Sequence, residues 1–294
     1  MPEPTKAPQS GEPPMRWFDR LLVVDRRWIY LLMAVAVCLP AVFPFSVPVG
    51  VTREVRSVYD YVESLKPGDT TLLAIDYDPS TLAELQPMTE VIMAQAFRRG
   101  AHCIVTALSQ FGPAMAEGII DGVAAQAGKK RNIDYTFLGY KPYPGIVILA
   151  MGTDFRVPFP TDYYGTRLDD IPMMRDLHNY RDIKAVISLS AGSVADMWIT
   201  YANAKYGVPV ALGLTGVMGS DYYPYLQSGQ VFGLIPGIKG AAEYEQLAGV
   251  LGSGSRGMPY QVVTHVVILT FMVITNIGYI AQRRARRRAA MQSR

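Results

Sequence analysis

The sequence predicts an α/β protein: an open, mostly parallel sheet flanked by helices, with an apolar segment on each side of it. Three observations lead to this prediction. Short β-rich runs alternate with helical patterns through residues 51–256, as in βαβ proteins. Most of these runs are continuously apolar, which is typical of strands covered on both faces. Uncharged stretches long enough to cross a bilayer lie before and after this region. The order of the elements is Rossmann-like.

Each expected element follows from its local pattern. The expected strands are Thr71–Asp76, Cys103–Leu108, Tyr135–Leu138, Ile146–Met151, Ala185–Leu189 and Val208–Leu214. The expected helices are Thr52–Leu65, Ser80–Arg99, Gly112–Ala127, Tyr164–Asn179, Val194–Lys205 and Ile238–Leu251. Thr52–Leu65 precedes the first strand and has apolar residues at helical spacing.

The two uncharged stretches predict one N-terminal and one C-terminal transmembrane helix. Trp28–Val49 contains 22 residues without a charge, and a helix of that length rises about 33 Å. Prolines weaken the last third of this stretch as regular helix. Val262–Ile280 is the second apolar stretch. The sequence therefore divides into five parts: a Pro-rich disordered leader (1–15), an N-terminal transmembrane anchor (16–50), the α/β domain (51–256), a C-terminal transmembrane helix (257–282) and a basic tail (283–294).

Charge predicts an orientation and excludes some functions. Arginines stand before the first apolar stretch, and an arginine cluster at 283–288 follows the second. The positive-inside rule then places both termini in the cytoplasm and the central domain in the periplasm or outside the cell. Residues 51–256 hold 17 Lys plus Arg against 21 Asp plus Glu, a net of −4. A domain with this balance lacks the basic surface that nucleic acid requires. Two cysteines and three scattered histidines have no metal-ligand spacing, so we expect no metal site.

The first expected strand ends in "IDYDPST", residues 75–81. This pattern resembles the first motif of haloacid-dehalogenase-type phosphohydrolases. The resemblance implies that Asp76 is the nucleophile and Asp78 the general acid/base, with Thr106 near the family's second motif and Mg²⁺ as cofactor. Pro79 stands where that family has glycine, and no third or last motif is complete.

The same residues have a structural interpretation. Asp78 can cap a helix whose first position is Pro79, and Thr81 and Glu84 have the spacing of a capping box. These roles leave Asp76 alone unexplained. We favour the structural interpretation, and under it we expect no cofactor.

Two further loops follow strands, where α/β sheets bind ligands. The sequence "SLSAGS" offers hydroxyls and backbone amides at a helix start, which suits an anion; its candidate ligand-binding residues are Ser188, Ser190, Gly192 and Ser193. The glycine-rich stretch after the last expected strand has no clear period, and its aromatic residues Tyr222, Tyr223, Tyr225 and Phe232 are candidates for an interface. The alternative is that these rings cover an edge of the sheet.

We therefore expect a membrane-anchored, non-enzymatic Rossmann-like module. It would act as a subunit or scaffold of a membrane protein assembly, as a homo-oligomer or with membrane protein partners, and could include a small-molecule pocket. The alternatives are a membrane-bound phosphohydrolase or phosphotransferase that uses Asp76 and Asp78, and an extracytoplasmic solute-binding domain that serves a transporter or sensor.

Overall fold

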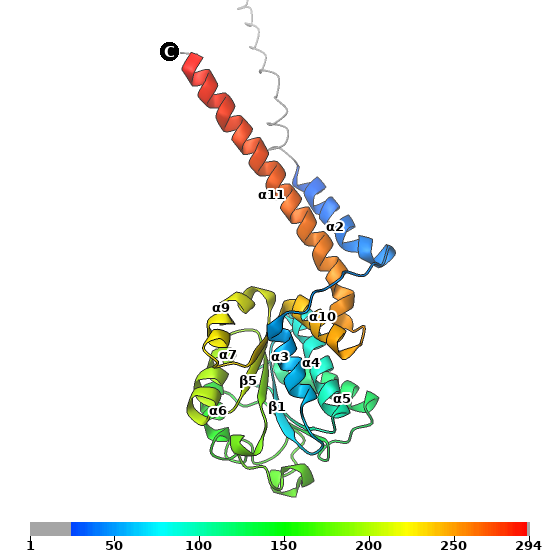
Figure 1. The fold of residues 1–294 in the computed structure, drawn as a ribbon, viewed down its shortest axis with the longest axis vertical. Coiled ribbons are helices and arrows are strands. Elements are labelled where there is room, and N and C mark those ends of the chain that lie inside the picture. Colours follow the sequence, from blue (N-terminus) through cyan, green and yellow to red (C-terminus); the bar gives the residue numbers. More distant parts are fainter. Residues whose placement is uncertain (1–24, 293–294) are drawn as a thin grey trace, which may run out of the picture. The chain divides into compact units, whose positions relative to one another are not determined.

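The computed structural model describes residues 25–292 (Figure 1). The predicted leader, residues 1–15, lies outside this range. The chain forms two units, which we describe separately. The larger is Ser46–Met258, and the other is made of the chain on either side of it.

The larger unit is built on a six-stranded sheet in the order β3-β2-β1-β4-β5-β6. Every neighbouring pair is parallel, so the predicted α/β class is confirmed. The chain moves outward from β1 to β3 and then returns to the other side of β1 with β4, which makes the β1–β4 boundary the switch point of a doubly wound sheet. The strands are β1 Thr70–Asp76, β2 His102–Thr106, β3 Tyr135–Gly139, β4 Val186–Ser190, β5 Val210–Leu214 and β6 Gly233–Pro236.

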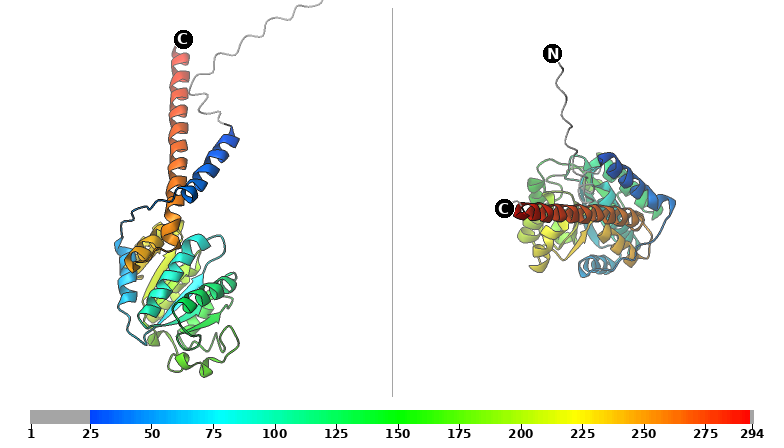
Figure 2. Two further views of the ribbon diagram at one scale, coloured as in Figure 1. Left: turned by 90° about the vertical axis from the view of Figure 1, so that its right-hand side faces the viewer. Right: turned by 90° about the horizontal axis from the view of Figure 1, so that it is seen from above.

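Helices cover both faces of the sheet (Figures 1 and 2). All seven residues of β1 are buried: Leu73 and Ile75 belong to one core and Leu72 and Ala74 to the other, as alternation along a strand requires. The first core is closed by α3 Arg53–Glu63, α4 Leu82–Arg98, α5 Gly112–Gln126 and α10 Gly237–Ala248. The second is closed by α6 Pro144–Met151, α7 Val194–Met197, a π-helical segment Trp198–Asn203, α8 Ala204–Tyr206 and α9 Gly216–Gln227.

The predicted strand Ile146–Met151 is wrong, because this run is the helix α6. A short apolar run has no period that separates a buried strand from a buried helix. Pro144 provides the missing signal, since proline suits the first turn of a helix. Val147, Ile148 and Met151 are buried, at a spacing that places them on one side of the helix.

The predicted helix Tyr164–Asn179 is also wrong. Short 3-10 turns occupy this region instead, at Leu168–Asp170 and Pro172–Met174, and a third follows it at Tyr180–Asp182. Pro172 disfavours a helical conformation in the residue before it, which would break a continuous helix.

The glycine-rich stretch after β5 is more regular than expected, because it contains α9 and β6. Gly233 explains how β6 fits. A Cβ at this position would lie 2.8 Å from the carbonyl oxygen of Glu54 and 3.2 Å from the amide nitrogen of Val58, both on α3. Only glycine therefore lets the last strand approach α3 this closely.

The apolar stretches differ in length. The helix α11, Ser253–Gln292, contains a segment, Ser253–Ala285, that is long and apolar enough to cross a membrane and has few buried side chains. The helix α2, Arg26–Val42, ends well before Val49, and residues 44–52 are not helical. Its 17 residues rise about 25 Å, less than a hydrocarbon core of roughly 30 Å. Ser253–Ala285 is therefore the helix with spanning length in the described part of the chain.

Candidate functional site

The carboxyl edge of the sheet, at the switch point between β1 and β4, brings several predicted residues together. Asp76 ends β1 and is in register with Ser190 of β4, while Ala74 is in register with both Ser188 and Thr106. Residues paired in a parallel register point to the same face. The four polar side chains therefore belong to one face of the sheet, the face that Trp198 also helps to cover.

Asp76 is held on both sides. Its side chain is 2% exposed; Oδ1 accepts a hydrogen bond from the Leu108 amide at 2.6 Å, and Oδ2 accepts one from Trp198 Nε1 at 2.9 Å. Burial raises the pKa of this carboxyl to about 6, although both hydrogen bonds oppose the shift. Asp76 thus joins the loop after β2 and the π-helical segment to the end of β1. A buried carboxylate with both oxygens engaged is poorly arranged to attack a phosphoester.

Asp78 lies in the loop after β1, and its side chain accepts hydrogen bonds from a residue of the same loop. Its Oδ1 accepts hydrogen bonds from the Ser80 amide at 2.8 Å and the Ser80 hydroxyl at 2.6 Å. The side-chain hydrogen bond from Ser80 is the main cause that lowers the pKa of Asp78. A general acid requires a shift in the opposite direction, so this arrangement favours a turn over catalysis.

The predicted caps of the following helix are wrong in detail. The helix α4 begins at Leu82, three residues after Pro79, and the Thr81 side chain makes no capping hydrogen bond. Glu84 does not return to the helix start; its Oε2 accepts from the Gly216 amide at 2.7 Å. A contact with the first residue of α9 replaces the capping box, and only the tertiary structure brings these residues together.

The residues of the "SLSAGS" loop separate into two environments. Ser188 and Ser190 are fully buried within β4, and their hydroxyls have no hydrogen-bond partner among the described residues. Gly192 has φ +137°, and Ser193 is exposed and does not cap the next helix. Thr106 donates to the Gly139 carbonyl at 3.4 Å. The structure does not gather the four predicted residues into one exposed anion loop, so anion binding stays a prediction.

The predicted interface aromatics contact their own domain. Tyr222 is buried and its ring centre lies 5.7 Å from that of Tyr225. Phe232 stacks on Tyr61 of α3 at 4.4 Å, and the Tyr223 hydroxyl donates to Glu54 Oε1 at 2.5 Å. These contacts match the alternative in which the rings cover the edge of the sheet, and Tyr223, 36% exposed, offers the most accessible ring.

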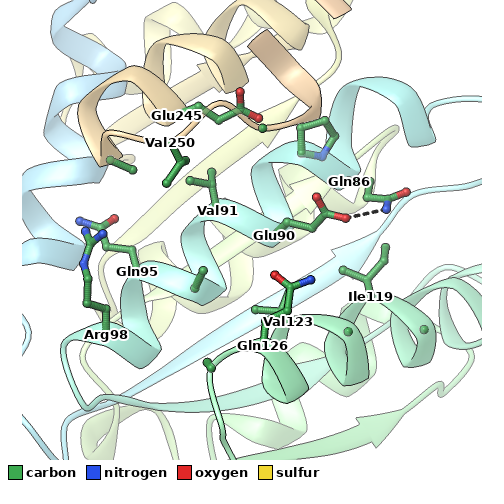
Figure 3. A pocket seen from close by; sticks show the side chains of 17 residues that line it. Gln86, Glu90, Val91, Gln95, Arg98, Ile119, Val123, Gln126, Glu245 and Val250 are labelled. Atoms are coloured by element: carbon green, nitrogen blue, oxygen red, sulfur yellow. Dashed lines mark hydrogen bonds between the residues drawn. The ribbon is translucent and has the colours of Figure 1, made fainter. Parts of the chain in front are cut away.

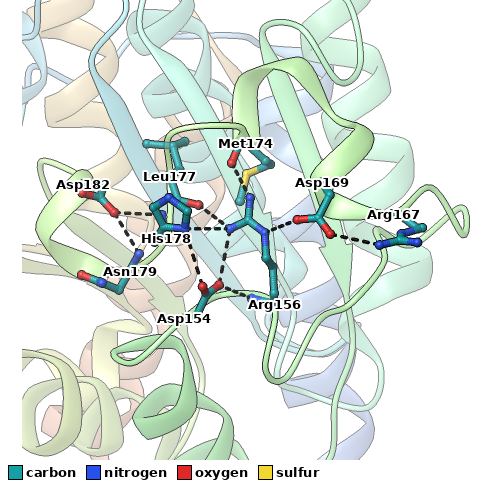
Figure 4. Close-up of polar contacts among 9 residues, drawn as sticks. All are labelled: Asp154, Arg156, Arg167, Asp169, Met174, Leu177, His178, Asn179 and Asp182. Atoms are coloured by element: carbon teal, nitrogen blue, oxygen red, sulfur yellow. Dashed lines mark hydrogen bonds and ion pairs between the residues drawn. The ribbon is translucent and has the colours of Figure 1, made fainter.

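A second polar cluster organises the segment between α6 and β4 (Figure 4). Arg156 Nε donates to Asp169 Oδ1 at 2.6 Å, and its Nη atoms donate to the carbonyls of Leu177 at 2.9 Å and Met174 at 2.8 Å. Asp154 also contacts this guanidinium, at 3.4 Å. Arg156 thereby connects parts of this long segment that are 13 to 21 residues away from it in the sequence and that no regular helix or strand joins.

Two glutamates of α10 were not anticipated from the sequence. Glu243 and Glu245 are each 1% exposed. Glu243 Oε2 accepts from the Thr52 amide at 2.8 Å and the Thr52 hydroxyl at 2.6 Å, and Oε1 contacts Lys239. Glutamate is rarely buried unless it is paired or hydrogen-bonded. The usable signal was the pattern "EYE", two glutamates two residues apart inside a helix that also contains alanine, leucine and isoleucine.

Glu245 binds the start of α11. Its Oε1 accepts from the Gly254 amide at 2.8 Å, and its Oε2 accepts from the Ser255 amide at 2.7 Å and the Ser255 hydroxyl at 2.6 Å. These amides belong to the first turn of a helix, where backbone donors have no partner within the helix. A carboxylate is also favoured there by the helix dipole. We call Glu243 and Glu245, with the backbone they bind, the α10 junction.

In residues 25–292, no three His, Cys, Asp or Glu side chains gather as a metal site. No protein-family model, no curated protein and no solved structure matches the chain. The geometry of the chain itself is therefore the basis of the functional interpretation.

Proposed function

We propose that the chain is a non-enzymatic, membrane-attached α/β subunit of a membrane protein assembly. The α10 junction is the observation that carries this proposal. One helix uses two buried carboxylates to hold the segment that leads into the domain, at Thr52, and the segment that leads out of it, at Gly254 and Ser255. A simple tether would need no such fixation.

The connection to the apolar segment supports the same function. The helix α11 begins in the larger unit and continues without interruption into the spanning segment. A Gly/Ser linker would behave as a flexible coil, whereas a helix is a semi-rigid connection. We infer that the domain and the spanning segment are joined through continuous helix, a connection that suits a subunit of a membrane assembly.

The candidate carboxylates of the catalytic alternative serve structural contacts. Asp76 binds Leu108 and Trp198, and Asp78 binds Ser80. This arrangement supports the non-enzymatic proposal over the phosphohydrolase alternative.

The proposal includes two crossings with the domain on the extracytoplasmic side. The arginines at 283–288 and those before Trp28 favour cytoplasmic ends. Because α2 is short, part of the non-helical stretch 43–50 would have to lie at the interface. Labelling with a membrane-impermeant maleimide tests this in a Cys38→Ser background: Ser220→Cys in the domain should react in intact cells, and Ser293→Cys in the tail should react only after lysis.

The subunit function is tested by the native mass of the full-length chain in mild detergent, with identification of co-purifying protein. We expect a discrete homo-oligomer or a fixed partner. The matched variant Glu243→Gln/Glu245→Gln should lose or loosen this assembly while α/β structure persists in circular dichroism. A monomer without a partner, for both proteins, contradicts the proposal.

A further inference from the structure

A cavity of about 560 Å³ opens between α4, α5 and the segment that follows α10 (Figure 3). Its volume lies within the range of small-molecule sites, roughly 300–1,000 Å³. Its apolar surface comes from Val91 on α4, Ile119 and Val123 on α5, and Val250 after α10. We call it the α4–α5 cavity. Its lining comes from α4, α5, α10 and the residues after α5 and α10, and includes none of the residues that the sequence patterns singled out.

The charged groups of the cavity are not equivalent. Arg98 forms an ion pair with Glu63 at 3.5 Å, and both oxygens of Glu245 already accept hydrogen bonds from α11. Glu90 accepts only a hydrogen bond from Gln86 Nε2, at 2.6 Å, and forms no ion pair within the described residues. Glu90 is therefore the lining carboxylate with the fewest partners in the described residues, and the one best placed to receive a cation.

Glycines keep the α5 side of the cavity open. Gly118 and Gly122 line it one helical turn apart, and an added Cβ at either position would meet no atom within 4 Å. Glycine in a helix interior costs roughly 0.5–1 kcal/mol relative to alanine. These two glycines give no packing benefit in return, but they leave room for a ligand.

We propose that the α4–α5 cavity binds a small amphipathic cation, with its ammonium group on the Glu90 carboxylate and its apolar body on Val91, Ile119 and Val123. The Gln86 and Gln126 amides, also on the lining, would complete the polar end. The ligand class follows from charge and shape together: one carboxylate without an ion pair in the described residues, beside an apolar surface.

The same cavity contacts the α10 junction. Val250, Gly252 and Glu245 line it, and a Cβ on Gly252 would lie 3.1 Å from Glu245 Oε2. A ligand in the cavity would thus touch the short connection whose end Glu245 caps. An effect of the bound ligand on α11 rests on the proposed function, whereas the binding of the ligand does not.

The test uses the full-length chain in nanodiscs of an uncharged galactolipid, which carries no ammonium group. Tryptamine is the probe, and indole-3-acetate has the same ring with the opposite charge. Titration calorimetry should show that the wild type binds tryptamine. The affinity of the wild type for indole-3-acetate, and that of Glu90→Gln for tryptamine, should each be lower by about tenfold or more, because the hydrogen bond between two charged groups is lost. Gly122→Leu should abolish binding by filling the cavity, and Gly118→Leu should repeat this result.

Ala125→Leu is the matched control, since Ala125 is exposed on α5 and does not line the cavity. It should bind tryptamine as the wild type does. Unchanged melting temperatures of the variants exclude unfolding. Equal binding by the wild type and Gly122→Leu, equal binding of the two probes, or no binding of tryptamine would each overturn the ligand site. Normal binding by a chain that is monomeric and partnerless would overturn the proposed function alone.

Discussion

Replacing Glu245 by alanine tests the α10 junction directly. The substitution removes one buried carboxylate and leaves three donors without their acceptor: the Gly254 amide, the Ser255 amide and the Ser255 hydroxyl. Gly254 is buried and Ser255 is half-buried, so water can replace the lost acceptor only in part.

The expected magnitude follows from these contacts. A hydrogen bond to a charged group contributes about 1.5–3 kcal/mol, and loss of an ordinary N-cap side chain costs about 0.5–2 kcal/mol. Three such bonds are not additive, because one carboxylate makes them and its own desolvation opposes them. We therefore expect a loss of about 2–4 kcal/mol in the free energy of unfolding of the larger unit.

Denaturant unfolding measures this loss through Trp198, which is fully buried, after Trp17 and Trp28 are replaced by phenylalanine. Hydrogen exchange should also accelerate at residues 250–256 before the rest of the domain. Gln246→Ala, an exposed position on the same helix, is the control and should change stability by no more than about 0.5 kcal/mol. A Glu245→Ala protein as stable as this control, with unchanged exchange, would refute the junction.

Three further substitutions test other parts of the fold. Burial raises the pKa of Asp76 from 3.8 to about 6, so the folded state binds this proton more tightly. Relative to Asp76→Asn, the wild type should therefore gain roughly 2.4 kcal/mol in the free energy of unfolding as the pH falls from 7 to 4, and a pH-independent difference in denaturant unfolding would contradict this. Gly233→Ala should lower the free energy of unfolding by about 1–3 kcal/mol, because the added Cβ meets α3, whereas Gly118→Ala should be neutral or slightly stabilising. Equal melting temperatures of the two variants would be inconsistent with the tight contact at Gly233. Arg156→Lys cannot bind Asp169, Met174 and Leu177 together, so limited proteolysis of residues 154–182 should become faster than in the Arg167→Lys control.

The sequence patterns were sufficient for the sheet where strands are continuously apolar and bounded by turns. Five expected strands match β1 to β5 within a few residues. The pattern failed for α6, whose short apolar run has no usable period, and for β6, whose four residues follow a glycine-rich stretch. In both cases tertiary contacts select the conformation, and these contacts join residues far apart in the chain.

Site prediction had a different limit. The spacing of Asp76 and Asp78 indicated a candidate catalytic pair. In the structure, however, the Asp76 carboxylate accepts a hydrogen bond from Trp198, 122 residues away in the sequence. Glu243 likewise binds Thr52 over a separation of 191 residues. Local patterns indicate which residues have unusual chemistry, but the partner that determines their role comes from the topology of the sheet.

The junction and the cavity together make a prediction that neither makes alone. A ligand shifts an equilibrium only by its difference in affinity for the two states. Here the two states are Glu245 bound to the first turn of α11 and Glu245 released from it. A body resting on Val250 and Gly252 favours the bound state, since it confines the connection that must move for release.

If tryptamine binds the bound state about tenfold more tightly, it stabilises that state by about 1.4 kcal/mol, part of the 2–4 kcal/mol expected for Glu245. Exchange at Gly254 and Ser255 should therefore slow when tryptamine saturates the wild type. Glu245→Ala should remove this slowing while calorimetric binding persists, because Glu90 is intact; Glu90→Gln should weaken binding, yet retain the slowing at saturation. Slowing that survives in Glu245→Ala would show that the cavity reaches α11 by another route, because the carboxylate that links them would then be absent.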